Sequence, residues 1–213
     1  MAYGKSPSLD ELLARGDVWR GSDTHAAPGE LLRTGYPRLD RALGGGWPAT
    51  GLTELVGEHA PIVGLRLLMP ALAELTGRGD WTAWVAPPYI PYAPGLHQAG
   101  IYLERLVWVR PPSDTETLAA TVDLVRSGTL AVVLAWPTVS VAHSELRRIQ
   151  LAADDARTWT VLLQDGQAER QPSPARLRLS LATSTEGLQV SVLKRRGGAP
   201  VSAFEVEAGP YRL

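Results

Sequence analysis

Residues 31–75 read LLRTGYPRLDRALGGGWPATGLTELVGEHAPIVGLRLLMPALAEL, and this stretch decides the fold. The amphipathic pattern at 36–43 predicts a short helix, and the glycines that follow it predict a turn. Residues 52–56 predict an apolar strand, a glycine-bounded loop comes next, and leucines at helical spacing then predict a helix. A strand, a loop and a helix in this order are typical of an α/β protein with a mostly parallel sheet.

The same order holds a nucleotide's phosphates in P-loop proteins, on backbone N–H groups at the start of the helix. The consensus G-x-x-x-x-G-K-[ST] supplies a lysine for the phosphates and a hydroxyl for magnesium. Here six residues separate Gly57 from Gly64, whereas the consensus has four between its glycines. Leu65 and Arg66 replace the lysine and the hydroxyl. Pro61 also removes one N–H from the loop. We therefore expect a degenerate Walker A loop, remnant at Gly57, Gly64, Leu65 and Arg66, that binds no nucleotide.

Length and composition exclude several classes of protein. The 213 residues suit a single domain, and the formal net charge of −1 gives no long-range attraction to nucleic acid or to anionic membranes. The chain contains no cysteine, which excludes disulfides, thiolate metal sites and a cysteine nucleophile. No run of about 18 apolar residues is visible, so we expect a cytoplasmic protein that does not cross a membrane.

The rest of the chain continues the alternation of strands and helices. Apolar runs predict strands at 80–86, 106–109, 130–134 and 159–163. Ser113 and Glu116 have the spacing of a capping box, so a helix is expected from there to about residue 126. Residues 140–157 predict another helix, whose charged side chains are interpreted as a solvated face.

Short motifs dispersed along the chain resemble a known family. The segment 34–57, TGYPRLDRALGGGWPATGLTELVG, is similar to the one that leads into the core ATPase domain of RecA-family proteins. The combination of GGGWP, VAPPYIPYAP, LAW and LKRRGGAP resembles the ImuA family, RecA-like accessory proteins of bacterial mutagenesis cassettes within the SulA/RecA-like superfamily. The resemblance implies a RecA-like core, with a mostly parallel central sheet flanked by helices and antiparallel strands at the C-terminus. It divides the chain into an N-terminal helix and linker at 1–30 and the core domain at 31–213.

Two more positions of a RecA-like ATPase site are changed. In such ATPases a glutamate that activates water follows one strand, and an aspartate that orders magnesium ends another. Here Pro87 and Pro88 follow the first of these strands, and Ala135 and Trp136 end the second. The four histidines show no metal-site spacing either, so we expect no metal and no other cofactor. The resemblance therefore implies a protein that is not an enzyme and has no catalytic residue.

The C-terminal part contains a basic cluster, Lys194, Arg195 and Arg196. Alternating apolar and polar residues at 176–181 and 188–193 predict two antiparallel strands before it, and a closing strand follows. By resemblance to RecA, Lys194 and Arg196 take the places of two basic residues that reach the ATP of a neighbouring protomer. The cluster is thus a candidate for contacting a partner or phosphate. A solvated hairpin edge protected by charge is the alternative.

Near the N-terminus, a capping-box spacing of serine and glutamate predicts a short helix with an apolar side formed by Leu9, Leu12 and Leu13. In RecA-like proteins a helix of this kind packs on the neighbouring protomer, so these leucines are a possible interface. A helix that folds back on its own core is the alternative.

The function implied by the resemblance is that of a non-catalytic adaptor in SOS-induced mutagenic translesion DNA synthesis. Its partners would be RecA and an ImuB-type Y-family polymerase homologue, with an error-prone replicative-type polymerase subunit engaged indirectly. It would lie in the cytoplasm and associate with the nucleoid. Two alternatives stay open. One is a weak single-stranded-DNA-binding module that uses Arg176, Arg178 and the basic cluster, and the other is a residual nucleotide-binding ATPase.

Overall fold

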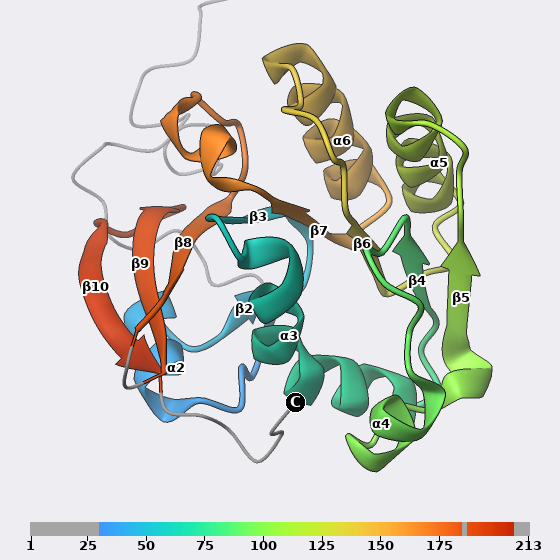
Figure 1. Cartoon of the computed structure of the whole chain (residues 1–213), viewed down its shortest axis with the longest axis horizontal. Helices are drawn as coiled ribbons and strands as arrows, with labels where there is room; N and C mark the ends of the chain where they lie inside the picture. The colour runs from blue at the N-terminus through green and yellow to red at the C-terminus, as the bar shows by residue number, and fades with distance from the viewer. Residues whose placement is uncertain (1–29, 185–186, 207–213) are drawn as a thin grey trace, which may run out of the picture.

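The computed structural model describes residues 30–184 and 187–206. Its centre is an eight-stranded sheet with the strand order β10-β9-β8-β3-β7-β6-β4-β5 (Figure 1). The strands are β3 (Gly51–Val56), β4 (Thr82–Val85), β5 (Leu106–Val109), β6 (Val132–Ala135), β7 (Trp159–Gln164), β8 (Leu177–Thr183), β9 (Leu188–Arg195) and β10 (Val201–Val206). The strands from β8 to β5 run parallel, whereas β9 and β10 are antiparallel to their neighbours. The mostly parallel sheet with antiparallel C-terminal strands is therefore confirmed.

Helices cover both faces of the sheet (Figure 1). They are α2 (Pro37–Leu43), α3 (Ala60–Gly77), α4 (Ala93–Gln98), α5 (Asp114–Arg126) and α6 (His143–Asp155), with short 3₁₀ turns η1 (Leu103–Arg105) and η2 (Gly166–Arg170). A separate antiparallel pair, β1 (Leu31–Leu32) and β2 (Trp47–Pro48), brackets α2. The described part of the chain is thus a three-layered mixed α/β structure.

Two apolar cores result from this arrangement. One lies between the sheet and α2, α3 and α4, and includes Leu39, Leu68 and Leu163. The other lies between the sheet and α5 and α6, and includes Val122 and Ile149. Strands β3, β4, β6 and β7 are buried along their whole length, which explains why their sequences are mostly apolar instead of alternating. The exceptions are buried polar side chains, among them Thr53, Glu54 and Gln164.

Local sequence signals account for several boundaries. Ser113 Oγ accepts a hydrogen bond from the Glu116 N–H at 3.3 Å and donates to the Glu116 carboxylate at 2.7 Å, so the predicted capping box does begin α5. Gly44 ends α2 with φ +78°, a left-handed conformation that favours glycine.

Helix α3 is longer and more apolar than expected, since no run of about 18 apolar residues is visible in the sequence. Of the described residues, only this helix has the length and hydropathy of a membrane span, and half of it is buried inside the protein. A core helix of a soluble protein passes the same test. Its leucines pack on the sheet, so the burial of α3 accounts for its apolar composition.

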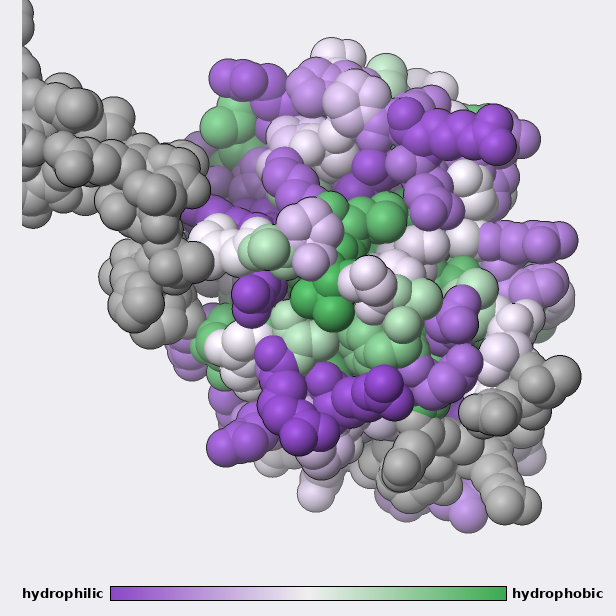
Figure 2. Space-filling model, turned by 90° about the vertical axis from the view of Figure 1, so that its left-hand side faces the viewer, coloured by the Kyte–Doolittle hydropathy of each residue, from purple (hydrophilic) through white to green (hydrophobic). Residues whose placement is uncertain are grey.

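The open edge at β10 is partly covered by α2. The Arg38 guanidinium lies 5.5 Å from the centre of the Phe204 ring, and its Nη1 donates to the Glu205 carbonyl oxygen at 3.3 Å. Figure 2 shows this side of the molecule, where polar side chains surround a small apolar area. Charged groups along an edge strand discourage pairing with other strands.

Candidate functional site

The prediction of a glycine-bounded loop from Gly57 to Gly64 is wrong, because residues 60–64 of this stretch are helical. Gly57 follows β3 with φ +143°, and a Cβ there would lie 2.1 Å from the Leu181 carbonyl oxygen of β8. Only glycine tolerates both conditions. Helix α3 then begins at Ala60 and already contains Gly64. The backbone therefore makes no long phosphate-binding loop after β3.

Gly64 has a packing role. A Cβ at this position would come 3.0 Å from Leu163 Cδ2 and 3.1 Å from Leu55 Cδ1, so the missing side chain lets α3 lie close to the sheet. Leu65 packs against the same core, and the Arg66 carbonyl oxygen accepts a hydrogen bond from the Tyr36 hydroxyl at 3.2 Å. These residues join α3 to its surroundings and leave no cradle for phosphate.

The indole of Trp136 contacts the first turn of α3. Trp136 follows β6, and its Nε1 donates to the Pro61 carbonyl oxygen at 2.8 Å. Its ring lies 5.9 Å from that of Trp84. In the described residues no group of three or more histidine, aspartate or glutamate side chains could hold a metal ion.

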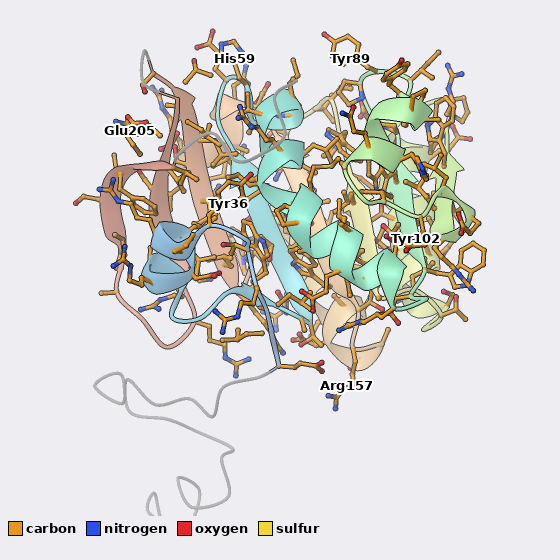
Figure 3. The ribbon with its side chains drawn as sticks, turned by 90° about the horizontal axis from the view of Figure 1, so that it is seen from below. Tyr36, His59, Tyr89, Tyr102, Arg157 and Glu205 are labelled. Atoms are coloured by element: carbon orange, nitrogen blue, oxygen red, sulfur yellow. The ribbon has the colours of Figure 1, made fainter. Side chains whose placement is uncertain are left out.

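The most exposed large apolar side chains lie at the edge formed by the carboxyl ends of the parallel strands. Tyr89, Ile90 and Tyr92, in the loop between β4 and α4, are 70%, 72% and 72% exposed. Ile62 in the first turn of α3 and Val139 in the loop after β6 are also exposed. We call these five residues the edge patch. Figure 3 shows Tyr89 at the same end of the molecule as His59, with Arg157 at the opposite end.

The loop that carries most of the edge patch is stiffened by its own sequence, PPYIPYAP at 87–94. Each proline fixes its φ and restricts the residue before it, so the chain between β4 and α4 has few accessible conformations. The Tyr92 ring lies against Gly95 at the start of α4. Three exposed apolar side chains on a stiff loop are typical of a protein-binding surface, because apolar patches on soluble domains mark sites of interaction.

The basic cluster does not form one surface. Lys194 is directly opposite Arg178 of β8, and its Nζ donates to the Ser173 carbonyl oxygen at 2.7 Å. Burial lowers the pKa of Lys194, the nearby Glu54 carboxylate opposes this shift, and Arg178 adds to it. Arg195 points to the other face of β9, since side chains alternate along a strand, and its guanidinium packs on Gly44 at the end of α2.

The remaining basic residues are also partly engaged. Arg196 is exposed in the turn after β9, and its backbone N–H donates to the Arg176 carbonyl oxygen at 2.8 Å. Arg176 itself pairs with Asp154, with Nη2 and Oδ1 2.7 Å apart. Leu9, Leu12 and Leu13 lie outside the described residues.

A buried polar network that the sequence did not reveal lies beneath Lys194. The Glu54 carboxylate, fully buried in β3, accepts hydrogen bonds from Gln164 Nε2 at 2.9 Å and from Ser173 Oγ. Arg178 Nε lies 3.4 Å from the same carboxylate. The Arg178 guanidinium donates to the backbone carbonyls of residues 168, 169 and 171, which belong to η2 and the residue after it. This network fixes the segment between β7 and β8.

Comparisons with known proteins identify the family. The family described as cell division inhibitor SulA matches residues 51–160, which are 110 of the 213 residues. The cell division inhibitor SulA of Klebsiella aerogenes is 27% identical over 126 residues, covering 58% of this chain and 75% of that protein. That of Edwardsiella piscicida is 29% identical over 120 residues, covering 55% and 70%. A crystal structure of SulA from Pseudomonas aeruginosa, 24% identical, covers 54% of this chain and 98% of that chain with a TM-score of 0.46.

These findings overturn the assignment to the ImuA family. Of the motifs quoted for that resemblance, VAPPYIPYAP and LAW lie inside the stretch that matches SulA, whereas GGGWP and LKRRGGAP lie outside it. The translesion adaptor function is therefore wrong, as are RecA, an ImuB-type homologue and a polymerase subunit as partners. Neither a DNA-binding module nor a residual ATPase is supported. The chain is not an enzyme, in agreement with its match to a family of cell division inhibitors. Because the family match spans more than half of the chain, the protein belongs to the SulA family of cell division inhibitors.

Proposed function

We propose that this protein inhibits cell division by binding a protein of the division machinery through the edge patch. The family match supports the function, and the exposure of Tyr89, Ile90 and Tyr92 supports the surface. A protein without catalytic groups inhibits by occupying its target, so one copy acts on one target molecule. The inhibition should therefore depend on the amount of protein and on its affinity.

The edge patch has the properties of an efficient binding surface. Burying a large apolar side chain contributes about 1.5–3 kcal/mol, and aromatic residues dominate binding energy at interfaces. The prolines at 87–94 reduce the conformational entropy that the loop loses on binding. The loop after β6 and the start of α3 would enlarge the contact, since Trp136 holds them together.

The finer features of the fold are part of the same proposal. We infer a single core domain at 31–213 with a RecA-like ancestry, in which β3 is the strand that carried the ancestral P-loop. Its place inside the sheet, between β7 and β8, supports this inference. The N-terminal leucines Leu9, Leu12 and Leu13 and the exposed Arg196 stay proposed partner contacts.

The cellular setting also follows from the family. We place the protein in the cytoplasm, where it would arrest division as part of the SOS response to DNA damage. Association with the nucleoid has no support, because the DNA-repair partners that implied it are wrong.

The experiment compares cell length in bacteria that produce the native protein or the double variant Tyr89→Ser/Ile90→Ser. The native protein should produce filaments, whereas the double variant should leave cells at normal length while melting at the native temperature. Loss of one such side chain at the centre of an interface costs ~2 kcal/mol, or about thirtyfold in affinity. Tyr102→Ser is the matched control, since Tyr102 is also exposed and lies away from Tyr89 (Figure 3).

The possible results distinguish an error in the proposed function from an error in the proposed binding surface. If the native protein leaves cell length unchanged, division inhibition itself is wrong. If both the native protein and the double variant produce filaments, the inhibition uses a surface other than the edge patch.

A further inference from the structure

A groove lies along α6 and the C-terminal end of α5, away from the edge patch. Its lining comes mainly from one stripe of α6, at positions three or four residues apart, and has a volume of about 570 Å³. The side chains that shape it are Arg126, Arg147, Arg148, Leu151, Ala152 and Asp155. The opposite stripe of α6, which includes Leu146 and Ile149, packs on the sheet. The groove is therefore on the outer surface of this helix.

The groove carries an excess of positive charge. Arg126 comes from the last turn of α5 and Arg147 from α6, and neither side chain makes a hydrogen bond or an ion pair with the described residues. Arg148 pairs with Glu145, with Nη1 and Oε2 3.5 Å apart. Asp155 is the single acidic residue of the lining. A protein with a net charge of −1 thus holds two unpaired guanidinium groups on one surface.

The centre of the groove is apolar. Leu151 is 53% exposed in the middle of the stripe, and Ala152 and Ala156 lie on the same side of the helix. A purely solvated helix face carries polar residues at such positions. Basic groups around an apolar centre match a segment that offers carboxylates on either side of an apolar side chain.

We propose that the α6 groove binds a short acidic segment of another protein, with carboxylates at Arg126 and Arg147 and an apolar side chain on Leu151. The lining favours protein over nucleic acid, because it contains no aromatic ring on which a base could stack. Guanidinium groups bind carboxylates through paired, charge-assisted hydrogen bonds, which fixes the position of the segment. This surface is separate from the edge patch and goes beyond the proposed inhibition of division.

The test uses the full chain and two labelled peptides in fluorescence anisotropy. One peptide has glutamates around two central leucines and a length of roughly 12 residues, which spans the ~20 Å of α6 in helical or partly extended form. The second peptide has glutamine in place of each glutamate. The glutamate peptide should bind at least about tenfold more tightly, and the difference should shrink as salt screens the charges.

Three variants locate the binding. Arg126→Glu/Arg147→Glu should abolish the preference for glutamate, and Leu151→Ser should weaken binding without reversing any charge. The matched control is Arg33→Glu/Arg41→Glu, which changes the net charge equally at exposed arginines elsewhere.

The proposal is overturned if both peptides bind equally, or if the control double variant weakens binding as much as the groove variant. It is also overturned if a single-stranded oligonucleotide binds the groove more tightly than the glutamate peptide. Circular dichroism checks that each variant is folded, and since all the changed side chains are exposed or line the groove, the fold should be retained.

Discussion

Replacing Glu54 by leucine tests the role of the buried polar network. In the native protein, the Glu54 carboxylate faces Arg178, Gln164 and Ser173. Leucine removes the negative charge and every acceptor, while the guanidinium of Arg178, only 7% exposed, stays in place. The substitution leaves a buried positive charge that only backbone carbonyls compensate.

The expected loss of stability is large. Removing one partner of a buried ion pair costs about 3–5 kcal/mol, because the other charge stays away from water. Domains are stable by only about 5–15 kcal/mol, so this is a substantial share of the free energy of unfolding. For a chain of this length, each kcal/mol lowers the melting temperature by about 2–4 °C, which gives a fall of roughly 6–20 °C.

Urea unfolding followed by tryptophan fluorescence measures the effect. The signal is the sum of seven tryptophans and reports on unfolding of the whole domain; one of them, Trp159, is buried next to Thr53, the neighbour of Glu54. Glu54→Gln should cost less than Glu54→Leu, since an amide oxygen still accepts a hydrogen bond. The double variant Glu54→Leu/Arg178→Leu should be more stable than the sum of the single losses predicts, because neither charge is left alone.

Two results would refute this reasoning. One is a loss below about 1 kcal/mol for Glu54→Leu, the range of an exposed ion pair. The other is additivity of the two leucine substitutions, which would show that Glu54 and Arg178 do not interact.

Three more predictions follow from single features of the structure. Ser113→Ala should lower the free energy of unfolding by about 0.5–2 kcal/mol, measured by urea unfolding, because α5 loses its N-terminal cap; an unchanged midpoint would show that the cap adds nothing. Leu65→Lys/Arg66→Ser restores the missing Walker residues but should give no ATP binding in calorimetry, because both positions lie inside α3; heat of binding that requires magnesium would contradict this. The stability of the native protein should rise with pH just below 10.5, because the lowered pKa of Lys194 makes the folded state lose its proton first. Lys194→Gln should flatten that rise in unfolding experiments between about pH 8 and about pH 10, and an unchanged slope would assign it to other groups.

Local patterns predicted most of the fold. The capping box at Ser113, the apolar strands and the alternating C-terminal strands each depend on neighbours in sequence, and each is present in the structure. The start of α3 was predicted wrongly because a glycine can mark a loop or can allow close packing of the backbone. Gly57 and Gly64 were interpreted as the ends of a loop, whereas Gly57 allows a close approach to β8 and Gly64 allows α3 to pack on the sheet. Only the tertiary contacts distinguish these roles.

The proposed binding surfaces were harder to predict, since they depend on exposure. Tyr89, Ile90 and Tyr92 were visible as part of a proline-rich segment, but their outward orientation could not be deduced from the pattern. Lys194 and Arg195 were treated as one cluster although consecutive strand residues point to opposite faces, a signal that the alternation already contained. Leu151 lies on a helix face interpreted as solvated, and its exposure in a basic groove is visible only in three dimensions.

The wrong family assignment has a related cause. The stretch from TGYP to the degenerate loop was interpreted through its resemblance to RecA-family proteins, and such a stretch does not identify the family to which a chain belongs. The absence of each ATPase group was predicted from one residue type at one position. The identity of the partner depends on a surface, which no short motif defines.

The position of β3 inside the sheet has a consequence for the way the chain acquires its structure during synthesis. β3 is completed early, yet its neighbours are β7 and β8, and Trp159 donates to a threonine 106 residues earlier in the chain. Contacts between residues so far apart in sequence slow folding, because a long loop must close first. While the ribosome extends the chain, the apolar residues of β3 stay without a partner strand until β7 has emerged. Folding of the sheet's centre therefore occurs after most of the chain has been made, and refolding in solution should be slow by the standards of helical proteins of this size.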